Sequence, residues 1–152
     1  MVQIRSDSPA RTRQIGRELS ELLRAGSVVA LTGDLGAGKT VLAQGIAQGL
    51  GIDQLATSPT FVLLQQMDGG RLTFYHADAY RLDDARDAAE TGLEECLWGD
   101  GVSVVEWPDR VEELLPGDCW RITLKKAGDA ERLILIQPGD GYEDAAIEEV
   151  FA

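Results

Sequence analysis

The stretch GDLGAGKT, residues 33–40, decides the fold that this sequence predicts. Its spacing is that of a loop whose backbone amides bind phosphate oxygens, assisted by the N-terminus of the following helix. Gly36 and Gly38 permit the backbone dihedrals and the close approach that such a loop requires. We expect the Lys39 ammonium to reach the β- and γ-phosphates of a nucleotide and the Thr40 hydroxyl to bind Mg²⁺. The residues predicted to contact nucleotide here are Gly33, Asp34, Leu35, Gly36, Ala37, Gly38, Lys39, Thr40 and Val41.

The segments on either side of this loop have the structure that a phosphate-binding loop needs. SVVALTG, residues 27–33, is typical of a buried strand. Leu42, Ile46 and Leu50 recur at helical spacing, and Gly51 is typical of a helix end. Strand, loop and helix in this order are the context that separates a true phosphate loop from a chance glycine turn.

The rest of the chain alternates apolar runs with helical segments. Runs typical of strands lie at 27–33, 61–67, 71–77, 102–107, 119–125 and 131–137. Helices are predicted at 8–26, after the loop, and at 83–95, 109–115 and 143–149. Turn sequences at 68–70 and 128–129 predict two hairpins, which make the sheet mixed. The sequence therefore predicts an α/β fold, a three-layer P-loop NTPase-like domain over residues 1–152 with a mixed central sheet flanked by helices.

The charge of the chain bears on its partners. It carries 26 acidic and 14 basic residues among 152, for a net charge of −12 and a pI of about 4.4. Proteins that bind nucleic acid directly usually present a basic surface. The acidic balance is either that of a plain solvated surface or an indication that any role in nucleic-acid chemistry runs through a partner.

Composition also bears on the cellular compartment and on whether the chain has disulfides or a zinc site. Two cysteines, Cys96 and Cys119, are too few and too far apart for a disulfide framework or a zinc site. The N-terminus lacks the apolar core of a secretory signal, and no apolar run approaches the roughly 18 residues of a membrane helix. We therefore expect a soluble, cytoplasmic protein with reduced thiols.

Two carboxylates follow apolar strands at positions suited to Mg²⁺. Glu106 ends the β-branched run at 102–105, and Asp78 lies in FYHADAYR, residues 74–81. Phosphate-loop enzymes use such acids to hold Mg²⁺, directly or through water, and to orient the attacking water. Glu106 and Asp78 are therefore candidate metal and catalytic residues, together with Lys39.

Four further residues near these acids have alternative interpretations. In an extended chain His76 projects to the same side as Asp78, either as a hydrogen-bonded structural residue or as a catalytic one. Arg81 contacts a phosphate or pairs with an acid. Thr60, in TSPTF, is a candidate for the metal or γ-phosphate on a loop that nucleotide orders, or a plain turn residue. Trp107 packs on the nucleotide, on a partner or in the core.

A set of sequence blocks, taken together, resembles a known family. GDLGAGKT, SPTF, HADAYRL, TGLEE and VVEWP, in this order and spacing, closely resemble the bacterial tRNA threonylcarbamoyladenosine biosynthesis ATPase family TsaE. The blocks span residues 33–110, and the flanking segments fit the size of the family. The phosphate loop alone is shared by many families, whereas the combination of blocks is specific.

The resemblance implies an activity and partners that composition could not indicate. It implies a small P-loop domain that binds ATP with Mg²⁺ and hydrolyses it slowly. It also implies a requirement in the N6-threonylcarbamoyl modification of adenosine 37 of tRNA. The resemblance further implies that the chain docks on the transferase TsaD with its partner TsaB and permits repeated turnovers. It would then contact tRNA only indirectly, and neither DNA nor a membrane would be a partner.

The resemblance also assigns residues. Lys39 and the loop amides match the phosphate binders, Thr40 and Glu106 match the metal-associated pair, and Asp78 matches the acid of the His-x-Asp-x-Tyr-Arg block. Trp107 matches a tryptophan near the nucleotide. Arg132 resembles an arginine that approaches the nucleotide. Val41, where threonine often follows, and Cys96, where an aromatic residue is common, depart from the family pattern.

Three other functions are alternatives to the ATPase. A small-molecule P-loop kinase usually has an arginine-bearing lid, and the sequence contains no lid-like insertion. A GTPase commonly recognises guanine through an Asn-Lys-x-Asp block, and the chain contains no asparagine. A nucleotide-gated interaction module, in which ATP only orders the TSPTF loop, stays open as the alternative without hydrolysis.

Overall fold

The computed structural model describes residues 1–53, 64–80 and 92–151. One mixed sheet organises them, with the strand order β1-β7-β6-β2-β5-β4-β3. Its strands are β1 (Val2–Ser6), β2 (Val28–Gly33), β3 (Leu64–Met67), β4 (Phe74–Asp78), β5 (Val102–Glu106), β6 (Trp120–Lys126) and β7 (Arg132–Gln137). The helices are α1 (Pro9–Ser20), α2 (Lys39–Gly49), α4 (Leu93–Leu97) and α5 (Asp144–Val150), with a 3₁₀ helix η1 (Pro108–Leu114).

The centre of the sheet is parallel and its flanks are antiparallel. Strand β2 lies between β5 and β6 and is parallel to both, and β4 is parallel to β5. The two predicted hairpins pair β3 with β4 and β6 with β7 in antiparallel register. The predicted mixed sheet of an α/β fold is thus confirmed.

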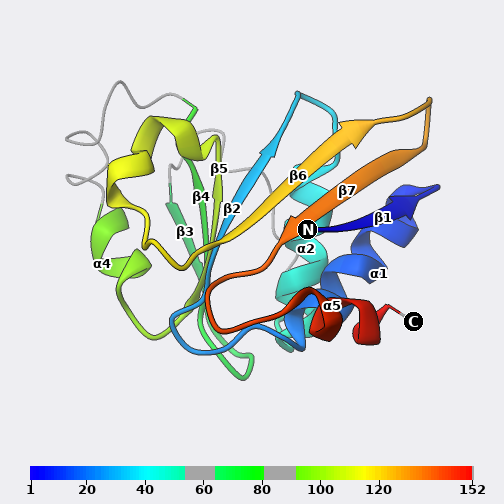
Figure 1. The fold of residues 1–152 in the computed structure, drawn as a ribbon. Coiled ribbons are helices and arrows are strands. Elements are labelled where there is room, and N and C mark those ends of the chain that lie inside the picture. Colours follow the sequence, from blue (N-terminus) through cyan, green and yellow to red (C-terminus); the bar gives the residue numbers. More distant parts are fainter. Residues whose placement is uncertain (54–63, 81–91, 152) are drawn as a thin grey trace.

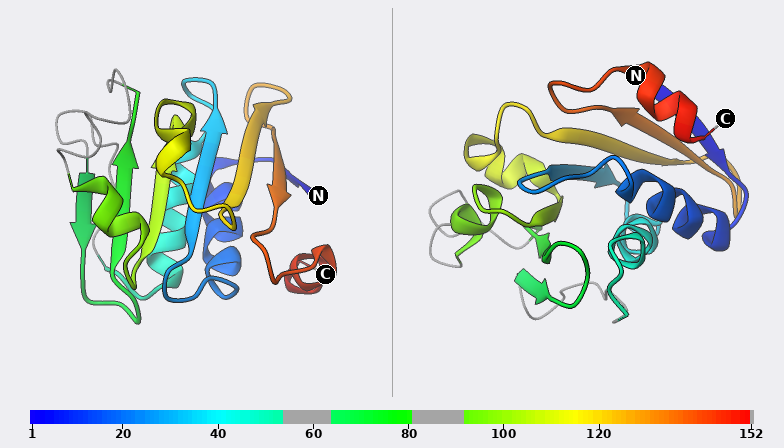
Figure 2. Two further views of the ribbon diagram at one scale, coloured as in Figure 1. Left: turned by 60° about the vertical axis from the view of Figure 1, so that its left-hand side comes forward. Right: turned by 90° about the horizontal axis from the view of Figure 1, so that it is seen from below.

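Helices cover both faces of the sheet, as Figures 1 and 2 show. Alternation along β2 divides the core, because Val29 and Leu31 pack with α1 and α2, whereas Val28 and Ala30 pack with α4 and η1. Both pairs of side chains are buried. The parallel strands are therefore covered on each side, as parallel sheets require.

Helices α1 and α2 pack unusually closely. A Cβ atom on Gly45 would lie 2.1 Å from the Arg13 carbonyl oxygen, and one on Gly16 would lie 2.5 Å from the Leu42 carbonyl oxygen. Glycine at both positions lets the two backbones approach. Ser8 caps α1 by accepting a 3.1 Å hydrogen bond from the Arg11 amide, as predicted.

Two predicted elements differ from the structure, and one strand was not predicted. The helix expected over 8–26 ends at Ser20, and the following turn brings the chain back to β2. The segment expected to be a helix at 109–115 is a 3₁₀ helix whose residue Val111 has non-helical dihedrals. Strand β1 was not predicted, because a single short alternation of Val2 and Ile4 at the end of a chain is a weak signal.

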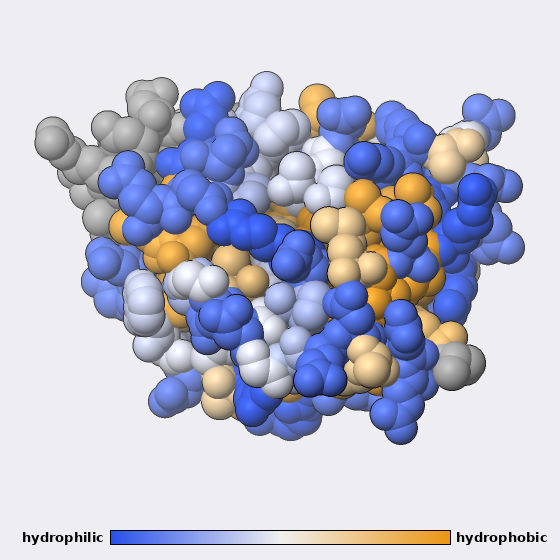
Figure 3. All heavy atoms as spheres, in the orientation of Figure 1, coloured by the Kyte–Doolittle hydropathy of each residue, from blue (hydrophilic) through white to orange (hydrophobic). Residues whose placement is uncertain are grey.

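The surface in the view of Figure 1 is largely hydrophilic, with apolar residues showing over β7 (Figure 3). Leu133 and Leu135 alternate there with Ile134 and Ile136, which face the core. Within the described residues, the structure contains no helix of sufficient length and apolar character to cross a membrane.

Candidate functional site

The loop GDLGAGKT connects the carboxyl end of β2 to the start of α2, at the top of the sheet in Figure 1. Gly36 and Gly38 have φ angles of 78° and 103°, in the left-handed region that favours glycine. The Asp34 carbonyl accepts a 3.0 Å hydrogen bond from the Ala37 amide, which closes a turn within the loop. A Cβ atom on Gly33 would lie 2.9 Å from the Leu124 carbonyl oxygen, so the loop must pass close to β6.

Lys39, the first residue of α2, is a buried basic residue. The residue is 5% exposed, and its ammonium forms no hydrogen bond with any residue in the described ranges. The nitrogen lies 3.7 Å from the centroid of the Trp107 ring. Burial lowers the pKa of Lys39, and the charges of Glu106, Asp78 and Asp34 oppose that shift in part. An anionic ligand with oxygen acceptors fits a buried ammonium that lacks them.

The two predicted acids lie side by side at the same edge. Asp78 and Glu106 are direct partners in the parallel register of β4 and β5. Glu106 is 3% exposed, and its Oε2 lies 2.5 Å from Nε2 of His76, which is fully buried. Asp78 accepts a 2.9 Å hydrogen bond from the Tyr80 amide. The carboxyl ends of β2, β4 and β5 therefore bring the loop, both acids and His76 together.

Trp107 forms one wall of the site. Its φ and ψ angles of 57° and 53° make it the one residue other than glycine with positive φ in the part of the chain that the structure describes. This turn directs the indole over Lys39, and the Tyr80 ring lies 4.9 Å away, centroid to centroid. A strained backbone at such a position is typical of functional sites. Trp107 thus packs on the phosphate-loop lysine rather than in the hydrophobic core.

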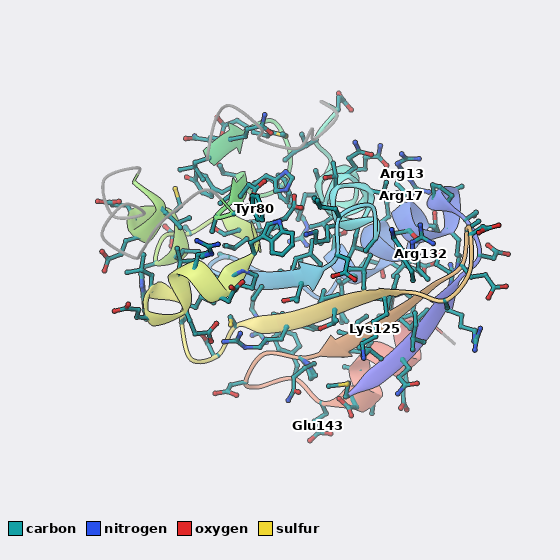
Figure 4. All side chains as sticks on the ribbon, turned by 90° about the horizontal axis from the view of Figure 1, so that it is seen from above. Arg13, Arg17, Tyr80, Lys125, Arg132 and Glu143 are labelled. Atoms are coloured by element: carbon teal, nitrogen blue, oxygen red, sulfur yellow. The ribbon has the colours of Figure 1, made fainter. Side chains whose placement is uncertain are left out.

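Arg132 supports the loop from the opposite side to Tyr80 (Figure 4). Its guanidinium donates to the carbonyls of Ala37 at 3.1 Å and Gly36 at 3.2 Å. It also donates to carbonyls of the β6–β7 turn, at Gly128, Asp129 and Glu131. Arg132 therefore fixes the loop to this hairpin, and its predicted contact with nucleotide stays a prediction.

A cavity of about 220 Å³ opens beside the loop, next to Arg132. Three separate segments line it: the start of α1, the loop with the first turn of α2, and the β6–β7 turn. The lining residues are Ser8, Pro9, Thr12, Gly36, Gly38, Val41, Asp129, Ala130 and Arg132. The contribution of Ser8, Pro9 and Thr12 could not be predicted, because no sequence motif links them to the loop.

The remaining predicted site residues differ in exposure. Asp34 and Leu35 are exposed at the tip of the loop, Ala37 is buried, and Thr40 and Val41 are half-buried at the start of α2. Thr60 and Arg81 lie outside the described residues, so their predicted roles stay predictions. Within the described ranges, no cluster of three histidine, cysteine or acidic side chains is placed to hold a metal. The oxygen donors there, Thr40, Asp78 and Glu106, suit a Mg²⁺ ion that also keeps water and phosphate ligands.

Comparison with known proteins places these features in a family. The sequence model described as "Threonylcarbamoyl adenosine biosynthesis protein TsaE" matches residues 6–134. The chain is 41% identical over 140 residues to the tRNA threonylcarbamoyladenosine biosynthesis protein TsaE of Bacillus subtilis, covering 91% of this chain and 87% of that one. It is 45% identical over 131 residues to the protein of the same name from Treponema pallidum, covering 86% and 96%.

A solved structure resembles the fold as a whole. The crystal structure of Bacillus subtilis YdiB superposes with a TM-score of 0.83 at 35% identity, over 99% of this chain and 93% of that one. The resemblance in fold and the matches in sequence extend well beyond the phosphate loop. This chain therefore belongs to the TsaE family.

Proposed function

We propose that this chain is an ATP-binding, Mg²⁺-dependent ATPase required for the threonylcarbamoyladenosine modification of tRNA. The observation that carries the nucleotide site is the buried Lys39 ammonium, which has no hydrogen-bond acceptor among the described residues and lies where the loop meets the N-terminus of α2. The β- and γ-phosphates of ATP supply the acceptors that this cation lacks. Family membership supports the role in tRNA modification.

The metal would be held by the Thr40 hydroxyl together with Glu106 and Asp78, directly or through water. Bound Mg²⁺ would neutralise the charge that develops on the phosphates. The chain's own groups divide the remaining tasks, because Lys39 binds phosphate oxygens and a carboxylate orients the attacking water. The register that places Asp78 beside Glu106 supports this division.

The base would occupy the cavity beside the loop. Pro9, Val41 and Ala130 give this cavity apolar walls, and the polar residues Ser8, Thr12 and Arg132 also line it. A flat ring with polar edges suits such a lining. The cavity adjoins the glycines of the loop, so one ligand would span both the cavity and the loop.

Hydrolysis would be slow alone and stimulated by a partner of the TsaD–TsaB transferase type. The net charge of −12 supports a role in which the chain contacts the partner and does not bind tRNA directly. The decisive experiment is single-turnover ATP hydrolysis, alone and with the transferase complex, run beside multiple rounds of tRNA modification. We expect the chain to be needed for the second and later rounds.

The same assay separates the alternatives. Lys39→Ala should abolish hydrolysis and tRNA modification, whereas Arg5→Ala, on the exposed edge strand, should leave both unchanged. If the rate of ATP hydrolysis stayed at the uncatalysed background even with the transferase complex, the chain would be a nucleotide-gated interaction module and not an ATPase. Transfer of phosphate to a small acceptor would identify a kinase.

A further inference from the structure

His76 is a buried polar residue to which the proposed function gives no task. It is the only histidine of the chain, and no part of its side chain reaches solvent. Its Nε2 lies 2.5 Å from Glu106 Oε2, on the neighbouring parallel strand. Its other nitrogen, Nδ1, is buried without a hydrogen-bond partner among residues 1–53, 64–80 and 92–151.

The direction of this hydrogen bond follows from the chemistry of the two groups. An ionised carboxylate only accepts hydrogen bonds, so Nε2 must carry the hydrogen and donate it to Oε2. The bond occupies one oxygen of Glu106 and leaves Oε1 without a hydrogen bond to any described residue. One carboxylate oxygen is thus fixed to β4, and the other is available to a ligand.

A second cation competes for Glu106. The charge of Glu106 is the largest of those that raise the pKa of Lys39, so the two groups are close enough to attract each other. Yet the Lys39 ammonium makes no hydrogen bond with Glu106 or any other described residue. A carboxylate that paired with Lys39 would withdraw both groups from a nucleotide and its metal. The bond from His76 opposes that pairing.

We infer that His76 is a positioning residue that holds Glu106 away from Lys39 with one oxygen free, and so sets the affinity of the site for Mg²⁺. The inference rests on the proposed nucleotide site. Hydrogen-bond partners of metal-binding carboxylates orient their ligands, and their loss typically lowers metal affinity by about 10–100-fold. A purely structural His76 would instead affect folding alone.

The test uses the full-length chain with ADP, and Mn²⁺ as a paramagnetic substitute for Mg²⁺. His76→Leu removes the donor, and His76→Gln keeps an N–H at the end of a side chain of similar reach. Phe74→Leu is the matched control. Phe74 is fully buried on the same face of β4, and its side chain has no group that can hydrogen-bond to Glu106. Free Mn²⁺ is measured by its electron paramagnetic resonance signal, and metal-free ADP binding by calorimetry.

We expect His76→Leu to weaken Mn²⁺ binding in the presence of ADP by about 10–100-fold. Metal-free ADP binding should change little, and His76→Gln should recover most of the loss. Phe74→Leu should lower the melting temperature and leave the Mn²⁺ affinity unchanged. If His76→Leu bound Mn²⁺ as tightly as the wild type, or if Phe74→Leu lost as much Mn²⁺ affinity as His76→Leu, the inference would be wrong. The proposed nucleotide site would still stand. Absence of ADP binding by the wild-type chain would overturn the proposed site and the inference with it.

Discussion

At the scale of single residues, the site brings buried groups of opposite charge together. Lys39 rests over Trp107, and Glu106 is held by His76. An unpaired buried cation costs free energy, which an anionic ligand can recover on binding. Functional sites commonly lower stability in this manner. Two predictions follow from the two charges.

Lys39→Met should stabilise the nucleotide-free chain while abolishing ADP binding. Burial lowers the pKa of Lys39 below 10.5, so the folded chain binds fewer protons than the unfolded chain between the lowered pKa and 10.5. The free energy of unfolding should therefore rise with pH across that window in the wild type, and this rise should vanish in the variant. At neutral pH we expect a gain of about 1 kcal/mol, or about 2–4 °C in melting temperature. A lower melting temperature for Lys39→Met, measured by calorimetry, would contradict this account.

Glu106→Gln should slow single-turnover ATP hydrolysis by about 10²-fold or more, because it removes the charge that would hold Mg²⁺ and orient water. Metal-free ADP binding should persist, since the phosphate contacts come from the loop and Lys39. The matched substitution Glu112→Gln alters an acid paired with Arg121 at the surface and should leave hydrolysis unchanged. Normal tRNA modification in cells carrying Glu106→Ala would remove Glu106 from the site.

At the scale of elements, the contact between α1 and α2 determines the shape of the cavity. Helix α1 and its N-cap contribute Ser8, Pro9 and Thr12 to the wall, and α2 carries Lys39 and Thr40. The two helices meet through glycine, so their separation has little freedom to change. The cavity beside the phosphate loop is therefore held at a fixed place relative to the loop.

Gly45→Ala should separate these helices. The added methyl group would lie 2.1 Å from the Arg13 carbonyl oxygen, a backbone atom that cannot rotate away. We expect a net loss of about 1–3 kcal/mol in the free energy of unfolding, despite the roughly 1 kcal/mol by which alanine favours a helix over glycine. Gly117→Ala, where a Cβ atom would meet no atom within 4 Å, is the control. Urea unfolding of both variants checks the prediction, and equal stability would contradict it.

The sequence predicted those parts of the site that depend on local pattern. The loop, the strands ending at Asp78 and Glu106, and the two hairpins all follow from spacing and alternation. The bond of Arg132 to the loop carbonyls and the role of α1 in the cavity could not be predicted. Both depend on distances between segments far apart in the chain, which no motif encodes. The contact of His76 with Glu106 required the register of β4 against β5.

At the scale of the whole molecule, charge limits the partners. A chain of net charge −12 repels the phosphate backbone at distances comparable with the screening length. We predict that isolated tRNA binds this chain with a Kd weaker than about 10⁻⁴ M and without the steep salt dependence of a basic protein. Fluorescence anisotropy with labelled tRNA at several salt concentrations checks this. Tight binding that falls steeply with salt would show a direct nucleic-acid surface.

Strand β1 begins at Val2 and, among the described strands, pairs with β7 alone, which begins at Arg132. During synthesis on the ribosome, β1 can therefore enter the sheet only after β7, which lies far downstream in the sequence, has been made. Arg132, which fixes the carbonyls of the phosphate loop, arrives in the same late segment. A nascent chain interrupted before this point carries GDLGAGKT without the hairpin that supports it. The phosphate loop thus gains this support only after the β6–β7 hairpin has been synthesised.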